Sequence, residues 1–416
     1  MSVLKPFRAY RPTKAEVKQV ACRPYDVLNA AEAKAESAGN PNSFYRVIKP
    51  EIDFPADHNP YDSSIYEKGK ENFDQLVSDS VMAQDATENL YVYQLIMDGR
   101  KQTGIVGCNA IDDYFNNNIK KHELTRPDKE EDRKNHVRYG KMNAEPVFFS
   151  YPAVAAIDTI VTQVQQGAPE YDFTSEDGIQ HTLWVIDDAA TVTQLTGLFE
   201  TDVPSIYVAD GHHRTAAGAL VGKEFRDADS TPNGTERYNY FMAVLFPDNQ
   251  LQIIDYNRVV KDLNGLSVDA FKETVAESFE IEAKGAGEYR PEALHTIGMF
   301  LDGEWYKLTA KAGTYDDSDP VGVLDVTILS KQILEPVLNI VDLRTDKRID
   351  FVGGIRGLGE LEKRVNSGEM TVAFAMYPVS MKQLIDISDN DLIMPPKVTW
   401  FEPKLRSGLF VHSLES

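Results

Sequence analysis

The sequence predicts a mixed α/β fold in two domains, and three observations support this. Apolar runs typical of buried strands alternate with Ala-, Glu- and Lys-rich stretches typical of helices. The 416 residues are enough for two or three domains of about 150 residues each. Hydrophobic residues make up 42% and charged residues 26%, the composition of an ordinary globular protein. We expect a core over 1–259, a smaller α/β domain over 260–385, and a proline-rich segment over 386–416 that returns to the core.

The first hundred residues predict a helix and a hairpin. Residues 30–38 are rich in Ala, Glu and Lys and end at a Gly-Asn-Pro sequence, which favours a helix that stops there. The apolar runs 90–96 and 103–108 flank Asp98-Gly99, a pair that readily adopts the left-handed backbone angles of a tight hairpin turn. We therefore expect the two runs to pair as antiparallel strands.

The middle of the chain predicts further elements from apolar periodicity and from capping residues. They are a helix beginning near Pro127 with Thr125 as its N-cap, a strand-helix-strand pattern over 155–199, a buried strand over 203–209, a helix over 212–221, and a hairpin formed by 238–245 and 251–256.

Charge and cysteine content exclude several classes of partner. Lys and Arg number 43 against 65 Asp and Glu, so the formal net charge is −22. Such a chain repels nucleic acid and an anionic membrane surface, so we expect small-molecule partners instead. Cys22 and Cys108 are too few for a disulfide framework or a Cys/His zinc site. With no long apolar run and no apolar leader, the expected location is the cytoplasm. The sequence leaves open whether the chain forms a homo-oligomer.

The sharpest local signal is the Asp-Gly-His-His-Arg sequence from Asp210 to Arg214, between the expected strand and helix. Gly211 permits a tight turn. The first turn of a helix presents unpaired N–H groups and the positive end of the dipole, and Arg214 can hold two phosphate oxygens, so we expect an anion site. Asp210 could orient the imidazole of His212 or His213, or hold Mg²⁺. In the alternative interpretation Asp210 only caps the helix and the histidines pack.

A second group of candidate residues precedes the charged helix. His122 and Glu123 come at an expected strand end, where α/β proteins place ligands. Glu123 could act as a general base or as a magnesium ligand, and Arg126 could face a transferring phosphoryl group. His-Glu-x-x-His is not present, because Arg126 stands where the second histidine would be, so this is not a zinc protease motif.

Two smaller groups complete the candidates. Asp26 offers an acid at a strand-to-helix junction, or else caps the helix locally. Lys397 and Lys404 lie in the proline-rich segment next to large aromatic residues. In so acidic a chain these lysines favour contact with a nucleotide or an acidic surface, the alternative being plain exposure to solvent.

Taken together and in this order, the motifs resemble one family, and the chain is identified as a member of the domain-of-unknown-function family ten-fifteen. The motifs that carry the resemblance are Arg23-Pro24-Tyr25-Asp26-Val27, Asn40-Pro41, Lys49-Pro50-Glu51, His122-Glu123, Asp132-Arg133, Ala209-Asp210-Gly211-His212-His213-Arg214, Met394-Pro395-Pro396-Lys397, Phe401-x-Pro403-Lys404 and Ser407-Gly408-Leu409.

The resemblance implies a ParB/sulfiredoxin-like core, shared by ParB proteins, sulfiredoxins and free serine kinases. Sulfiredoxins need a cysteine where this chain has His212, and ParB proteins need a DNA-binding helical domain and a basic face. The resemblance then implies a kinase-like phosphotransferase that moves a phosphoryl group from ATP or ADP to a small hydroxyl substrate. L-Serine is the best candidate for this substrate, and the reaction would require Mg²⁺. The alternative is a non-catalytic regulatory protein that binds CTP or ATP.

The kinase hypothesis gives expected roles to the candidate residues, although the base of the free serine kinases has no aligned position in this chain. Residues Asp210 to Arg214, with Arg126, Lys397 and Lys404, would bind the nucleotide. Either Asp210 or Glu123 would hold the metal. The catalytic residues would be Glu123 or Asp26 as the base, with His122 beside them.

Overall fold

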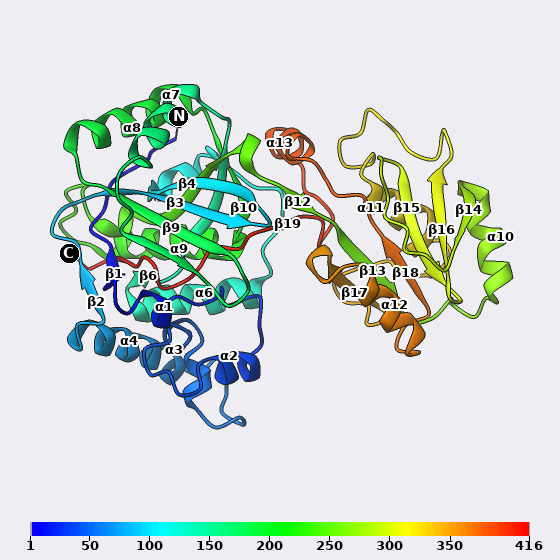
Figure 1. The fold of residues 1–416 in the computed structure, drawn as a ribbon, viewed down its shortest axis with the longest axis horizontal. Coiled ribbons are helices and arrows are strands. Elements are labelled where there is room, and N and C mark those ends of the chain that lie inside the picture. Colours follow the sequence, from blue (N-terminus) through cyan, green and yellow to red (C-terminus); the bar gives the residue numbers. More distant parts are fainter. Residues whose placement is uncertain (1, 416) are drawn as a thin grey trace. The chain divides into compact units, whose positions relative to one another are not determined.

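The computed structural model describes residues 2–415 and divides the chain into two compact units (Figure 1). Unit 1 consists of Met1–Leu251 and Pro403–Ser416, and unit 2 of Gln252–Glu402. Both units mix helices and strands, which confirms the predicted α/β class. The boundaries fall at 251 and 402, whereas the sequence predicts 259 and 385. The reason is strand pairing, since residues 253–260 and 400–401 form strands inside unit 2.

An eight-stranded sheet forms the centre of unit 1. Near one edge, β10 runs parallel to β5 and antiparallel to β7, and β7 runs parallel to β11. The remaining neighbours are antiparallel. The strands in spatial order are β5 (Ile119–Lys120), β10 (Ile206–Asp210), β7 (Val147–Tyr151), β11 (Tyr240–Pro247), β4 (Arg100–Ala110), β3 (Leu90–Met97), β9 (Gln180–Ile186) and β8 (Tyr171–Thr174).

Helices cover this sheet, with α7 and α8 packed together on one side and α6 and α9 on the other (Figure 1). Small residues bring α9 close to its neighbours. A Cβ atom at Gly222 would lie only 2.3 Å from the carbonyl oxygen of Tyr238. The helices of unit 1 are α1 (Val17–Val20), α2 (Ala30–Glu36), α3 (Tyr45–Ile48), α4 (Ser63–Ser78), α5 (Ile111–Phe115), α6 (Pro127–Gly140), α7 (Ala155–Val164), α8 (Ala189–Asp202) and α9 (His212–Ala228).

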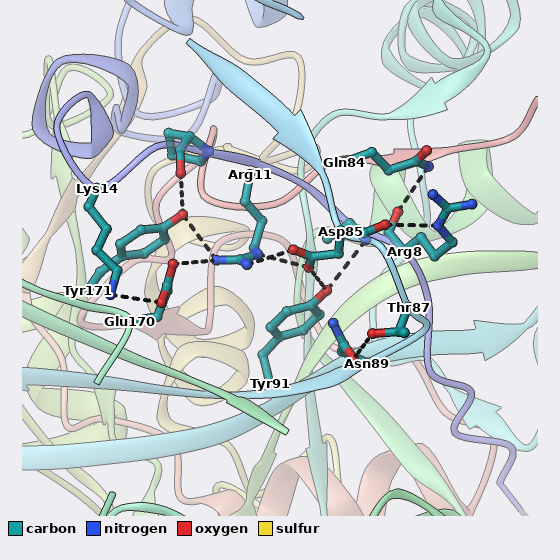
Figure 2. A network of polar contacts seen from close by, with 12 residues as sticks. Arg8, Arg11, Lys14, Gln84, Asp85, Thr87, Asn89, Tyr91, Glu170 and Tyr171 are labelled. Atoms are coloured by element: carbon teal, nitrogen blue, oxygen red, sulfur yellow. Dashed lines mark hydrogen bonds and ion pairs between the residues drawn. The ribbon is translucent and has the colours of Figure 1, made fainter. Parts of the chain in front are cut away.

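The N-terminal segment is tied to the sheet by the polar network in Figure 2. Strand β1 (Tyr10–Pro12) pairs with β2 (Met82–Gln84). Arg11 donates to Asp85 at 2.6 and 2.9 Å and to the hydroxyl of Tyr171 at 3.2 Å. The hydroxyl of Tyr91 also donates to Asp85, at 2.5 Å. Because a buried guanidinium and a carboxylate satisfy each other here, the segment that leads to Asp26 starts from a fixed position.

The C-terminal segment, red in Figure 1, runs across unit 1. Ser407 and Cys22 exchange two backbone hydrogen bonds, and Val411 does the same with Tyr10. The short strand β20 (His412–Ser413) pairs with β6 (Met142–Asn143). Most side chains of this segment are buried, so its backbone is held along its length.

Unit 2 is built on a six-stranded, wholly antiparallel sheet beside a two-stranded one. The sheets are β14 (Phe279–Gly285), β16 (Glu304–Ala310), β15 (Thr296–Leu301), β18 (Val372–Ala375), β13 (Tyr256–Val260) and β17 (Ile349–Gly353), and then β12 (Ile253–Ile254) with β19 (Trp400–Phe401). The helices are α10 (Val268–Ser278), α11 (Asp325–Leu329), α12 (Gly359–Asn366) and α13 (Met381–Asp389). No helix within residues 2–415 is long and apolar enough to cross a membrane.

Several predicted elements are confirmed. The hairpin around Asp98-Gly99 forms as β3 and β4, with positive φ angles of 51° and 79° at its two turn residues. The helix predicted over 30–38 is α2, and Asn29 caps it. The strand and helix predicted around Asp210 are β10 and α9, although α9 continues to Ala228.

Three element predictions are wrong. Residues 155–199 form helix, two strands and helix, and not strand, helix, strand. Residues 240–247 pair with β4 and β7, while 253–254 pair with β19, so the predicted hairpin between them does not exist. Helix α6 has Arg126 as its N-cap, because the hydroxyl of Thr125 is bound to Glu130 at 2.5 Å.

Candidate functional site

The turn from Asp210 to Arg214 joins β10 to α9, as the sequence predicts. Gly211 is the N-cap residue and has φ of +94°, a conformation that glycine adopts without steric cost. A Cβ atom there would lie 3.0 Å from Nε of Arg214, so a larger residue would crowd the guanidinium. No side chain caps the helix. The backbone N–H groups of the first turn therefore stay available to an anion.

Arg214 and Asp210 form the charged centre of the turn. Arg214 is 9% exposed and donates to Oδ2 of Asp210 at 3.0 Å and to the carbonyl oxygen of Pro146 at 2.8 Å. Lys404, from the C-terminal segment, donates to the other oxygen of Asp210 at 3.1 Å. Burial alone would raise the pKa of Asp210, but the charges of Lys404 and Arg214 outweigh it and lower the pKa to about 2. Two cations thus share one carboxylate at the start of the helix.

The two histidines of the turn differ in environment. His212 is 7% exposed, and its ring meets that of His122 edge-on, with centroids 4.5 Å apart. Burial lowers the pKa of His122 to about 4, so both rings are neutral at pH 7. Nδ1 of His212 lies 3.9 Å from a carboxylate oxygen of Glu123. The structure therefore brings His122, Glu123 and His212 together beside the turn.

His213 contacts the helix that follows Glu123. Its Nε2 accepts a hydrogen bond of 3.0 Å from the backbone N–H of Arg126. The guanidinium of Arg126 is more than half exposed and pairs with Asp128 at 2.9 Å. The backbone of Arg126 thus reaches the turn, whereas its side chain points to solvent.

Asp26 lies near Arg214 and His213, since its charge acts on both. It is exposed, and its charge is the main attraction that raises the pKa of the Arg214 guanidinium against the effect of burial. Next to it, the ring of Tyr25 lies 5.9 Å from the guanidinium carbon of Arg214 and 3.9 Å from that of Arg133. The two acids proposed as bases, Glu123 and Asp26, therefore both lie near the turn.

Two further buried residues belong to this site: Arg133, which the sequence offers only within the Asp132-Arg133 motif, and Glu145, which sequence reasoning missed. Arg133 is 8% exposed and donates twice to Asp132, at 2.7 and 3.1 Å. Glu145 is 9% exposed and accepts from the backbone of Tyr25 at 3.2 Å and from the hydroxyl of Ser407 at 2.9 Å. Glu145 is a single acidic residue before Pro146 and belongs to no motif, so the sequence gives no signal for it. The only signal for Arg133 is its place in the Asp-Arg pair that the family shares.

Within the Asp210–Arg214 turn, two buried ring or guanidinium nitrogens have no hydrogen-bond partner among residues 2–415. They are Nε of Arg214 and Nε2 of His212. A buried polar group left unpaired costs about 1–3 kcal/mol, so native proteins rarely keep one without a ligand or water. Both nitrogens belong to the turn that the sequence predicts as an anion site.

Lys397, the last predicted residue, belongs to unit 2. Its backbone oxygen accepts from the buried Arg258 at 3.0 Å, and its ammonium lies 5.7 Å from the ring centre of Tyr256. Among residues 2–415, no group of three or more His, Cys, Asp or Glu side chains is arranged to hold a metal ion. Both oxygens of Asp210 already accept from cations.

Comparisons with known proteins give a family and several distant structures. A family model described as a protein of unknown function (DUF1015) matches residues 4–327. No curated protein matches the chain. A free serine kinase mutant in complex with AMP is 10% identical and has a TM-score of 0.37, covering 72% of this chain and 87% of its own.

Two further solved structures are similarly distant. A conserved hypothetical protein from Pyrococcus furiosus is 13% identical with a TM-score of 0.36, over 73% of this chain and 93% of its own. C-terminally truncated SbnI from Staphylococcus aureus is 12% identical with a TM-score of 0.38, over 73% of this chain and 85% of its own.

Proposed function

We propose a function for a chain that belongs to DUF1015, a family of proteins of unknown function. It is a kinase-like phosphotransferase that moves a phosphoryl group from ATP or ADP to a small hydroxyl substrate, and L-serine is the preferred acceptor. One observation carries the proposal. The bare N-terminus of α9 carries a buried Arg214 and a buried His212, each with one nitrogen that lacks a protein partner.

Nucleotide phosphates supply what this turn lacks. The backbone N–H groups of His212 and His213 and Nε of Arg214 belong to the first turn of α9, and Lys404 adds a second cation beside Asp210. Phosphoryl transfer depends mainly on such positioning and charge neutralisation. The relationship to ParB and sulfiredoxin proteins belongs to this proposal, and its support is the Asp210–Arg214 motif.

A carboxylate would take the proton of the acceptor hydroxyl. Glu123 and Asp26 are the two candidates, because each lies near the turn and neither is buried. Mg²⁺ would be held by phosphate oxygens and Glu123, since Mg²⁺ commonly takes only one or two protein carboxylates. It would neutralise the charge of the phosphates. His122, which is neutral, would keep the ring of His212 in place.

The net charge of −22 supports small molecules as partners and no binding to nucleic acid. A cytoplasmic location also belongs to the proposal, and its support is that Cys22 and Cys108 are too few for a disulfide framework.

The direct test is product formation. The pure protein is incubated with L-serine, Mg²⁺ and either ATP or ADP, and O-phosphoserine is measured by mass spectrometry. We expect product from the natural chain, at least a 100-fold loss in Arg214→Ala, and no change in Arg138→Ala, which removes an exposed ion pair with Glu224.

Two other outcomes are informative. Calorimetry that shows CTP or ATP bound, with no product from either donor, would favour the non-catalytic regulatory alternative. A natural chain that binds no nucleotide would overturn both.

A further inference from the structure

A cavity of about 50 Å³ lies in unit 1 next to Arg214. Its walls come from α3, α4, α6, α9 and β11 and from the segment that leads into β7. One buried water needs about 10–15 Å³ measured in this way, so the cavity has room for roughly four atoms of that size. It is partly open, so a small molecule can enter it and extend outward.

One end of this cavity is charged and incompletely satisfied. Nε and Nη2 of Arg133 donate to Asp132, and the ring of Tyr25 lies 3.9 Å from the guanidinium carbon. The Oε1 atom of Glu145 accepts from Tyr25 and Ser407, whereas Oε2 makes no hydrogen bond among residues 2–415 and lies 3.9 Å from Nη1 of Arg133. Nε of Arg214, also in the wall, has no hydrogen-bond partner among residues 2–415. The wall of the cavity therefore carries a donor and an acceptor 3.9 Å apart that do not hydrogen-bond to each other.

Much of the remaining wall is apolar, with Val137, Ala217, Phe241 and Met242 among its residues, while Lys70 and Asn143 are polar. Burial and the charge of Arg133 hold the pKa of His136, also in the wall, well below its usual range, so this ring is uncharged at pH 7. A ligand that fits must be small, with an anionic group for Arg133 and a cationic group for Glu145.

We propose that this cavity is the acceptor site and that it takes a small α-amino acid. The carboxylate of the amino acid would bind Nη1 of Arg133, and its ammonium group would bind Oε2 of Glu145. The inference rests on the proposed function and deepens it. Because Arg214 lines the cavity and also bonds to Asp210 in the turn, one guanidinium borders both the acceptor and the phosphates.

The transfer step balances with the groups already named. The hydroxyl oxygen of the amino acid forms a bond to the terminal phosphorus, and the bond from that phosphorus to the bridging oxygen of the nucleotide breaks. The hydroxyl proton goes to the carboxylate of Glu123 or Asp26. The products are the phosphoamino acid and a nucleotide that is one phosphate shorter.

Three ligands test the recognition of the amino acid by calorimetry in the presence of ADP. L-Serine carries both charged groups, glycerate lacks the ammonium group, and ethanolamine lacks the carboxylate. We expect glycerate and ethanolamine each to bind at least tenfold more weakly than L-serine. Glu145→Gln keeps an oxygen that can accept from Tyr25 and Ser407. In this variant the Kd for L-serine should rise at least tenfold, while the Kd for glycerate should stay unchanged. A merely structural role for Glu145 predicts equal losses for both ligands and would overturn the proposal.

A second variant tests the place of the site. Val137→Phe puts a larger side chain on the cavity wall, and Val192→Phe makes the same change on α8, away from the cavity. Val137→Phe should raise the KM for serine at least tenfold and leave the Kd for ADP within twofold. Val192→Phe should change neither.

The outcomes separate this inference from the proposed function. Product formation with an unchanged serine KM in Val137→Phe would place the acceptor elsewhere and leave the kinase intact. Nucleotide binding with no amino acid binding at all would overturn the acceptor site. The absence of nucleotide binding in the natural chain would overturn the proposed function itself.

Discussion

Unit 1 contains two buried clusters built from the same residue types, and they differ in one respect. The Asp210–Arg214 turn and the cluster around His181 each combine an arginine, an aspartate and a histidine. Each contains one cation from the C-terminal segment, which is Lys404 beside Arg214 in the turn and Arg406 itself at His181. In the turn, two nitrogens lack a partner among residues 2–415.

Around His181 every ring nitrogen is bound. Nδ1 lies 2.7 Å from the hydroxyl of Tyr93, and Nε2 accepts from Arg406 at 3.3 Å and lies 3.1 Å from the hydroxyl of Ser175. Arg406 also donates to Ser175 at 2.9 Å and to Asp177. We call these five residues the tail latch. A polar cluster whose groups are all hydrogen-bonded holds chain segments in place, whereas a cluster with unpaired hydrogen-bonding groups can bind a ligand.

The largest expected effect concerns the tail latch. Arg406→Ala should lower the free energy of unfolding by about 3 kcal/mol, because it leaves buried polar groups without their cation. Urea unfolding followed by circular dichroism measures this. Arg138→Ala, at an exposed ion pair, should cost less than about 1 kcal/mol. If Arg406→Ala and Arg138→Ala lower the free energy of unfolding by the same amount, the tail latch contributes no more than an exposed ion pair does.

An intermediate effect follows from acidification. Burial and the charge of Arg406 lower the pKa of His181 to about 3, against about 6.5 in the unfolded chain. Between these values the unfolded chain binds more protons, so stability is full above pH 6.5 and falls as the pH drops. His181 should contribute a loss of about 2 kcal/mol between pH 6.5 and 4.5.

The comparison variant for this pH effect is His181→Asn. Its unfolding free energy, measured in urea at each pH, should decline less steeply across that range. An identical slope in both chains would show that other groups cause the acid sensitivity.

The smallest expected effect distinguishes the turn from the latch. In Lys404→Met, Asp210 loses one of its two cations, so the pKa of its carboxyl rises from about 2. We expect the Kd for ADP to rise about fivefold, or about 1 kcal/mol, with little change in unfolding free energy. Lys382→Met, an exposed change on α13, serves as the control. A large loss of stability without weaker ADP binding would make Lys404 part of the latch.

The sequence predicts best what is local. Asp98-Gly99 and Asp210-Gly211 each specify a turn by their own backbone preferences, and the structure has both. Glu145 and its proximity to Arg133 could not be predicted, because that proximity depends on how α6 and the segment after it pack. The wrong hairpin at 238–256 has the same cause, since β11 pairs with β4, more than a hundred residues earlier. Long-range pairing leaves little trace in a single sequence.

The return of the chain to unit 1 has a consequence for synthesis on the ribosome. Residues 403–415, which bring Lys404 to Asp210 and Arg406 to His181, are translated after all of unit 2. A nascent chain can therefore form most of the eight-stranded sheet early while its turn still lacks the second cation. The site is completed only after unit 2 has been translated, so a chain that stalls within unit 2 lacks Lys404 at Asp210.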